Sequence, residues 1–302
     1  MKTLFLSTIF LTNSFILFSQ DYVDLLKINA STTPFNNFDT SSAQSKLNEI
    51  NADLTFPIKV NEKLTIISGL IYETIQTKLF EDEKEKTFGS TTLKLGFNNQ
   101  FNEKWSLTTV FLPKISSDYK AIQTKDFQVG AIAFMKFKKR NNLNYKFGVY
   151  YNSELFGPIF VPMFGLYYLS PNKKFEANLM LPLQADLNYK LIPSINVGVN
   201  FLGQIRSYHL TNIKPEYHST YMARSTNELY GYLKFNFSKS ISLITKCGIS
   251  VGRNYRVYDE DDRIDFALPA TFIGGNRKQL NTDFSNGLIF QVSFLYRFNL
   301  NK

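Results

Sequence analysis

Ser207 and His209 form the pair of residues in this sequence whose types could support covalent catalysis. The chain has two histidines, His209 and His218, and a serine beside an imidazole can act as a nucleophile with a general base. A lipid hydrolase could be built in this way. On a strand, however, Cβ atoms two positions apart are separated by roughly 6–7 Å, which is longer than a hydrogen-bond contact. We therefore predict no catalytic residue and no enzyme activity.

The acidic run at 259–262, followed by Asp265, is the candidate for a metal site, because Ca²⁺ prefers carboxylate oxygens. The run lacks the spacing and the glycine of an EF-hand, so we interpret it as a solvated loop that binds divalent ions loosely. Gly274 and Gly275 lack the flanking strand and helix of a phosphate-binding loop. The single cysteine, Cys247, cannot pair within the chain. No metal site and no cofactor are predicted.

Eight basic residues lie on the polar file of alternating segments, opposite a file of apolar residues. They are Lys94, Lys136, Lys146, Lys190, Arg206, Lys234, Lys246 and Arg297. If the apolar file faces lipid, these side chains point into the lumen of a barrel, where few acids such as Asp186 oppose them. A water-filled basic lumen would favour anions. The alternative is that these charges pair with acids and fill a narrow barrel without a channel.

The alternation that positions these residues is clear in the last segment, 288–298. Its apolar file consists of Leu288, Phe290, Val292, Phe294, Tyr296 and Phe298, and the intervening residues are mostly polar. This period of two is typical of a strand with one apolar and one polar face. Similar segments of about ten residues recur from Leu47 onward, joined by short turns and longer loops. An edge strand of a soluble sandwich is the alternative.

About fourteen strands are predicted, with twelve as the alternative because the segments around Pro182 are short. The expected strands cover residues 21–30, 50–58, 64–77, 92–101, 105–115, 127–137, 143–152, 163–170, 175–181, 183–190, 195–209, 229–237, 241–257 and 288–298. Long loops are expected at 31–45, 80–87, 116–126, 210–224 and 258–284. An even number places both ends on one side, with short turns in the periplasm. The predicted fold is all-β, a transmembrane antiparallel up-and-down β-barrel without exposed sheet edges.

The N-terminal segment has the composition of a secretory signal peptide. Lys2 precedes an apolar stretch from Leu4 to Phe18, and polar residues follow it. We predict a signal peptide at 1–20, a barrel domain at 21–302 and a location in the cell outer membrane. No later apolar run is long enough for a helical span, since 155–169 contains two prolines. The formal charge of +9 is not gathered on a basic helix, finger or arm, so no nucleic acid partner is expected.

Three features together resemble a known class of proteins. The turn Asn-Glu-Lys occurs at 61–63 and again at 102–104, Leu181-Pro182 interrupts the strand pattern, and the chain ends with Phe294-Leu295-Tyr296-Arg297-Phe298. With them the chain resembles the outer-membrane β-barrel families of unknown function that are common in Bacteroidota. The resemblance implies the fold and the location but no residue-level activity. It also implies that Phe294, Tyr296 and Phe298 form the signal read by the barrel assembly machinery, although four residues follow Phe298.

Three functions are compatible with these observations. The first is a passive or ligand-gated pore for small, anionic solutes, because the predicted lumen is basic. The second is a non-conducting structural or adhesion barrel that acts through its loops. The third is an outer-membrane lipid hydrolase based on His209. The expected partners are outer-membrane lipid, the assembly machinery and small solutes, and the sequence leaves the oligomeric state open.

Overall fold

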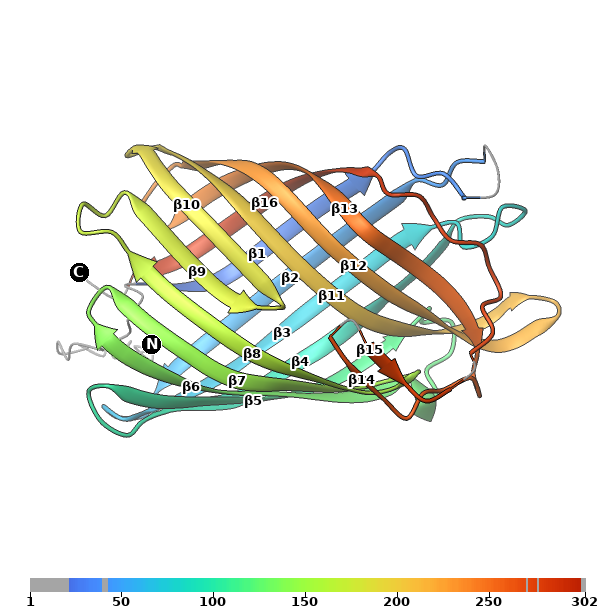
Figure 1. Cartoon of the computed structure of the whole chain (residues 1–302), viewed down its shortest axis with the longest axis horizontal. Helices are drawn as coiled ribbons and strands as arrows, with labels where there is room; N and C mark the ends of the chain where they lie inside the picture. The colour runs from blue at the N-terminus through green and yellow to red at the C-terminus, as the bar shows by residue number, and fades with distance from the viewer. Residues whose placement is uncertain (1–21, 40–42, 270, 276, 300–302) are drawn as a thin grey trace, which may run out of the picture.

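The computed structural model describes residues 22–39, 43–269, 271–275 and 277–299. The fourteen strands β1–β13 and β16 form a closed antiparallel barrel, as predicted (Figure 1). The barrel strands are β1 (Tyr22–Thr33), β2 (Leu47–Lys59), β3 (Leu64–Thr77), β4 (Lys86–Gln100), β5 (Trp105–Ser117), β6 (Phe127–Arg140), β7 (Leu143–Glu154), β8 (Gly157–Leu169), β9 (Phe175–Leu181), β10 (Gln184–Ile192), β11 (Ile195–Lys214), β12 (Tyr217–Asn236), β13 (Ile241–Asp259) and β16 (Leu288–Asn299). A 3₁₀ turn, η1 (Thr124–Asp126), precedes β6, and a small hairpin of β14 (Phe266–Leu268) and β15 (Thr271–Ile273) lies beside β8. The predicted signal peptide, 1–20, lies outside the described residues.

The ring closes where the last strand meets the first, since β1 pairs with β16, with Val23 opposite Phe298. The consecutive strands β8 and β9 also pair, with Phe164 opposite Leu181. Closure leaves no free sheet edge over the paired lengths, and such edges are costly in hydrocarbon because backbone polar groups find no partner there.

The two faces of the wall differ as the alternation predicts. Large apolar side chains such as Leu229, Leu233, Phe290 and Val292 are exposed on the outside. Their neighbours point inward and are mostly polar, because successive side chains of a strand point to opposite faces. The outer surface is therefore an apolar belt of the kind that lipid covers. Within the described residues, no helix has the length and apolar character needed to cross a membrane.

The two ends of the barrel are different. The short-turn end carries the turns at 60–63, 101–104, 141–142, 170–174, 193–194 and 237–240, and Tyr22 and Asn299 pair there (Figure 1). The long-loop end carries the segments 34–46, 78–85, 118–126 and 260–287. The first strand begins and the last strand ends at the same end of the barrel because the number of strands is even.

The prediction of a loop at 210–224 is wrong. β11 and β12 continue through this region as strands of 20 residues each, and they reverse at Pro215 and Glu216. Their ladder runs almost without interruption from Ile195 and Phe235 to Lys214 and Tyr217. Buried apolar side chains such as Leu210, Ile213 and Met222 are mixed with polar ones in this segment, so it does not show the regular alternation of a lipid-facing strand, although it pairs as a strand.

β8 also begins earlier than expected, at Gly157 instead of Met163, and it includes Pro158 and Pro162. The second half of β8 pairs with β9, from Phe164 onward. On that same edge, the first half of β8 forms only one bridge within the described residues, between Ile159 and Ala267 of β14. Proline has no N–H to donate, so it is tolerated on such an edge.

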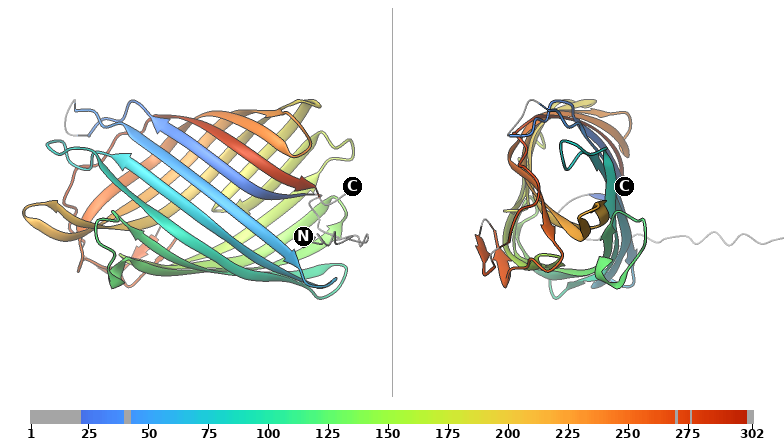
Figure 2. Two further views of the ribbon diagram at one scale, coloured as in Figure 1. Left: turned by 180° about the vertical axis from the view of Figure 1, so that it is seen from behind. Right: turned by 90° about the vertical axis from the view of Figure 1, so that its right-hand side faces the viewer.

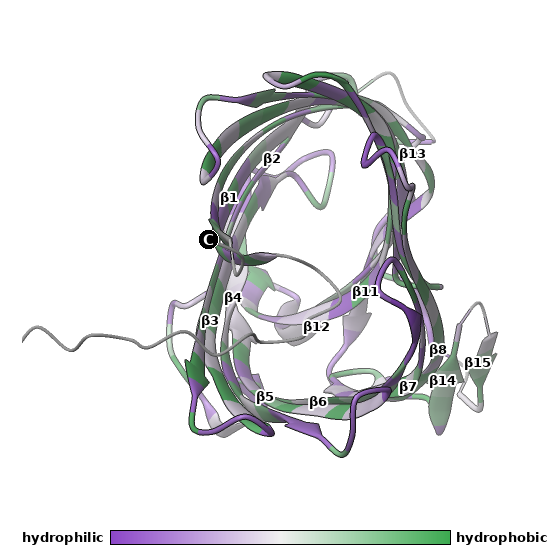
Figure 3. Cartoon of the chain, turned by 90° about the vertical axis from the view of Figure 1, so that its left-hand side faces the viewer, coloured by the Kyte–Doolittle hydropathy of each residue, from purple (hydrophilic) through white to green (hydrophobic). Residues whose placement is uncertain are grey.

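The β9–β10 hairpin is short, and beyond its tip β11 bends into the barrel. There His209 of β11 forms a parallel bridge with Ser117 of β5. The β11–β12 hairpin therefore crosses the interior of the ring, as the end-on views show (Figure 2, right; Figure 3). This inward hairpin divides the interior at the long-loop end.

Candidate functional site

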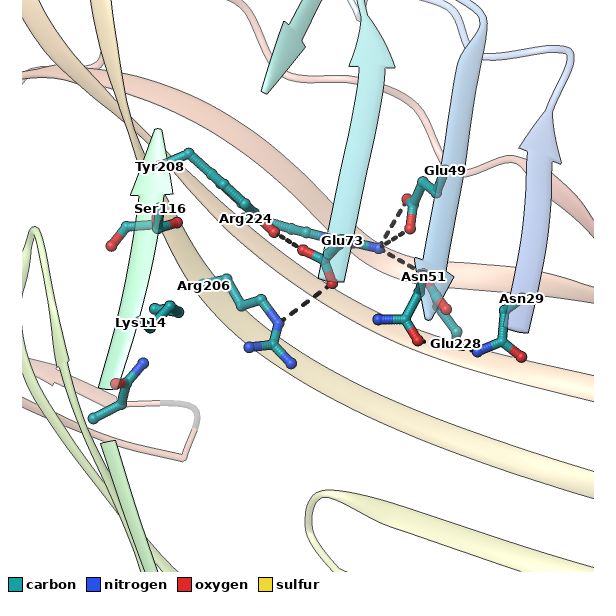
Figure 4. A network of polar contacts seen from close by, with 12 residues as sticks. Asn29, Glu49, Asn51, Glu73, Lys114, Ser116, Arg206, Tyr208, Arg224 and Glu228 are labelled. Carbon is teal, nitrogen blue, oxygen red and sulfur yellow. Dashed lines mark hydrogen bonds and ion pairs between the residues drawn. The ribbon is translucent and has the colours of Figure 1, made fainter. Parts of the chain in front are cut away.

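Arg224 of β12 is the centre of a buried ion-pair network in the long-loop half of the interior. Its side chain is 1% exposed, and its Nη2 atom lies 2.8 Å from both carboxylate oxygens of Glu49 in β2. The same atom is 3.4 Å from Glu228 Oε1. Figure 4 shows Arg224 reaching from β12 toward Glu49. The contact with Glu49 ties the inward hairpin to the opposite wall, and Glu228, on the same strand as Arg224, adds a second carboxylate to the guanidinium.

Glu73 of β3 continues this network toward β11. The Arg206 Nε atom lies 3.7 Å from Glu73 Oε2, and the Tyr208 hydroxyl donates a hydrogen bond to Glu73 (Figure 4). The Tyr208 ring packs on Phe88, with 5.2 Å between ring centroids. A buried carboxylate is stable as an anion only when charges and donors surround it, which the hairpin supplies here.

A third contact fastens the hairpin to the other side of the barrel. Glu154 of β7 accepts hydrogen bonds from both the backbone N–H and the hydroxyl of Ser207, each at 2.6 Å. Lys114 of β5 lies 3.4 Å from the other oxygen of Glu154. Ser207 is thus fully engaged with Glu154, and the structure does not bring its hydroxyl to His209.

The long loops pack over the network. Phe38, Phe80 and Phe284 come from three different loops and join one buried apolar cluster with side chains of β11–β13. The Phe38 and Phe284 rings are 4.7 Å apart. Beside them, two hydrogen bonds from Arg256, of 2.8 and 2.7 Å, lower the pKa of Asp283 below its usual value. Both apolar and ionic contacts therefore hold the long loops together at this end.

The short-turn half of the interior instead contains a cavity of about 740 Å³. Residues of three short turns contribute to its lining, among them Lys173, Ser194 and Lys239. Its basic lining residues are Lys27, Lys173, Lys174, Lys190, Lys234, Lys239, Lys246 and Arg297, and its acidic ones are Asp24, Glu176 and Asp186. The difference, 8 − 3, is a formal excess of five positive charges.

The eight basic residues singled out in the sequence fall into two groups. Lys190, Lys234, Lys246 and Arg297 line the cavity. Arg297 also bonds to Asp24, and Lys246 donates to Asn200 at 2.8 Å.

The other four lie away from the cavity lining. Lys94 bonds to Asp53 and, at 2.8 Å, to Thr55, and Lys146 donates to Asn178 at 3.3 Å. Lys136 faces Lys146 across the β6–β7 pair, and Arg206 belongs to the buried network.

Sequence reasoning missed the acids of the network. Glu49, Glu73 and Glu228 lie on the inward files of β2, β3 and β12. Their positions, one residue away from outward apolar side chains, were the signal in the sequence that they point inward. Their contacts with Arg224 and Arg206 could not be read from it, because they join distant strands; Glu49 and Arg224, for example, are 175 positions apart.

The side chains of the acidic run 259–262 bond to different partners. Glu260 lies 2.6 Å from Lys125, and the backbone N–H of Lys278 donates to Asp262. In the part of the chain that the structure describes, no three His, Cys, Asp or Glu side chains are grouped so that they could hold a metal ion.

Comparisons with known proteins give a family. A family model described as a domain of unknown function, DUF6268, matches residues 16–273. The chain belongs to this family. No curated protein matches the sequence.

Several solved structures are similar to this DUF6268 chain. The COG4313 outer membrane channel from Pseudomonas putida F1 has 9% sequence identity and a TM-score of 0.43, over 90% of this chain and 93% of that one. A TodX monoaromatic hydrocarbon channel mutant has 9% identity and a TM-score of 0.41, over 90% and 89%. The NanC porin has 7% identity and a TM-score of 0.38, over 90% and 98%.

Proposed function

We propose that this protein is an outer-membrane channel for small anionic solutes, closed at its long-loop end in the conformation described above. The observation that carries the proposal is the cavity at the short-turn end, with eight basic and three acidic lining residues. The proposal includes a Bacteroidota-type outer-membrane family, a cleaved signal peptide at 1–20, surrounding outer-membrane lipid and insertion by the barrel assembly machinery.

The charge of the cavity supports anions as the solute class. A low-dielectric barrel wall concentrates the field of the charges that line it, so small anions are enriched there over cations. Lys190, Lys234 and Lys246 come from three different strands, β10, β12 and β13, and so contribute to the field from separate directions.

The inward β11–β12 hairpin supports gating instead of a permanently open pore. Its contacts with Glu49, Glu73 and Glu154 fill the interior above the cavity. Movement of this hairpin toward the wall would connect the cavity to the long-loop end. Ion pairs suit such a gate, since a charged solute or a change of potential can compete with them.

A reversal-potential measurement on the purified protein in a salt gradient tests the proposal. The triple variant Lys190→Glu, Lys234→Glu, Lys246→Glu changes the cavity charge by −6, so an anion preference should become a cation preference. The effect should weaken near 1 M salt, where the screening length is about 3 Å. The matched control is Lys59→Glu, Lys63→Glu, Lys104→Glu, which makes the same charge change at exposed residues outside the cavity lining.

Unchanged anion preference in the cavity variant would show that these lysines do not line the conduction path.

A second candidate function, a non-conducting structural or adhesion barrel, is favoured by the dense packing of the long-loop end, where Tyr208 and Arg224 are buried. Absence of conductance at any voltage, together with loss of surface binding after deletion of 260–284, would support that second function.

A further inference from the structure

His209 lies between an aspartate and a serine that the sequence places far from each other. Its Nδ1 atom is 2.6 Å from Oδ1 of Asp126, and its Nε2 atom is 3.1 Å from Oγ of Ser219. Asp126 ends η1, His209 lies in β11, and Ser219 lies in β12 on the same face of the hairpin. The order Asp, His, Ser along these contacts is the arrangement of a catalytic triad.

The aspartate and the histidine are held in position by burial. Asp126 is inaccessible to solvent, and its Oδ2 atom accepts the backbone N–H of Gln123 at 2.8 Å. Asp126 Oδ1 and His209 Nδ1 are in close contact, but the geometry is not that of an aligned hydrogen bond. Catalytic hydrogen bonds often align only when substrate binds. Ser219 is only partly buried, and the side chains of Lys125 and Glu260 beside it are 27% and 32% exposed, so the serine end of the site borders solvent.

Lys125 and Glu260 complete the surroundings of the serine. The Lys125 Nζ atom is 2.6 Å from Ser219 Oγ and 2.6 Å from Glu260 Oε2. The Ser219 hydroxyl also bonds to Glu260. An ammonium group beside the nucleophile stabilises the negative charge that develops when the hydroxyl attacks a carbonyl.

We propose that Asp126, His209 and Ser219 form a hydrolytic site for carboxylic esters at the long-loop end. The Ser219 hydroxyl turns from Glu260 to His209, Oγ bonds to the ester carbon, and Nε2 takes the hydroxyl proton. The bond to the alcohol oxygen then breaks, and His209 returns the proton to the leaving alcohol. Water attacks the acyl-serine with His209 as base, releases the carboxylic acid and restores Ser219. Asp126 is a positioning residue that stabilises the imidazolium.

Aromatic side chains near the site favour esters with an acyl chain. Tyr221, two residues after Ser219, stacks on Tyr258 with 5.5 Å between centroids, and both rings are buried. Arg277 lies over the rings of Tyr258 and Phe272, and Phe272 is exposed. The site does not depend on whether the barrel conducts.

Covalent labelling of the purified full-length protein in detergent tests the proposal. A fluorophosphonate probe should modify Ser219 in the wild-type chain, identified by mass spectrometry, so that no folding-impaired variant is required. Hydrolysis of p-nitrophenyl butyrate should exceed that of the acetate. Both labelling and hydrolysis should disappear in Ser219→Ala and fall about 10²–10⁴-fold in His209→Gln. The matched control is His218→Gln, which changes the exposed histidine next to Ser219 and should leave both unchanged.

Three results would overturn the proposal. They are absence of both labelling and hydrolysis in the wild type, labelling at another serine, and loss of labelling in Glu260→Gln but not in His209→Gln. The last result would make Glu260 the base. Barrel content of each variant is monitored by its heat-dependent mobility on gels.

Discussion

Leu233 and Lys234 are adjacent in β12 but have opposite surroundings. Leu233 is 44% exposed on the outer wall, whereas Lys234 lines the internal cavity. A charge on the lipid face costs up to about 2–4 kcal/mol, most at the bilayer midplane and less toward either interface, while lumen positions tolerate change. Leu233→Arg should therefore lower the yield of heat-resistant barrel, and Lys234→Ala should not. Gel mobility of unheated samples measures this difference.

Equal yields for the two variants would contradict the assignment of the faces. The same comparison applies to other neighbouring pairs along the wall, because side chains on a strand alternate strictly. An apolar residue on the outer face therefore indicates that the next residue along the strand points into the barrel.

At the scale of elements, β16 has a special position because it is the last strand and closes the barrel. It pairs with the first strand, β1, on one side and with β13 on the other. The rings of Phe294, Tyr296 and Phe298 are exposed on its outer face. We expect Phe298→Ser to reduce the amount of protein in the outer membrane, because it removes a lipid-facing ring from the strand that closes the barrel. Membrane fractionation with immunoblotting measures the amount.

The control for this prediction is Phe237→Ser, which removes an even more exposed ring, 71%, at the turn after β12. Normal outer-membrane yield of the Phe298 variant would contradict an assembly role. Equal losses in both variants would indicate a general need for interfacial rings instead of a terminal signal.

At the scale of the whole molecule, the state of the barrel depends on contacts that cross its interior. Removal of one partner from a buried ion pair costs about 3–5 kcal/mol, because the other charge stays buried alone. In Arg224→Met, Glu49 and Glu228 would lose their shared cation, so the inward hairpin should be destabilised. We expect more frequent opening in planar-bilayer recordings.

Two further variants make this prediction specific. Arg224→Met combined with Glu49→Gln and Glu228→Gln removes the unpaired charges and should restore closure. Lys214→Met removes a cation of the same hairpin that pairs with Asp82 near its tip, and it should leave opening unchanged. Identical recordings for Arg224→Met and the wild type would show that the network does not hold the gate.

The sequence by itself determined the barrel class, the position of most strands and which face of each is apolar, whereas it left twelve or fourteen strands open and misplaced the ends of β8, β11 and β12. Segments such as 229–237 and 288–298 alternate with period two because lipid selects apolar side chains on one face of each strand. It also separated the eight basic residues from the lipid face. These are local properties, written in successive residues of one strand.

Only the tertiary structure decided how the interior is filled. The 210–224 region pairs as strands, and the inward bend of β11 brings Arg224 to Glu49 and His209 to Asp126 and Ser219. Likewise, it decided that Lys234 lines a cavity while Lys94 pairs with Asp53. These contacts join strands distant in sequence. They depend on the point at which β11 bends into the barrel, which lies just beyond the end of its pairing with the short strand β10. No regular alternation encodes that bend, because apolar residues such as Leu210 and Met222 and polar residues such as Thr220 and Arg224 share one face of the bending segment.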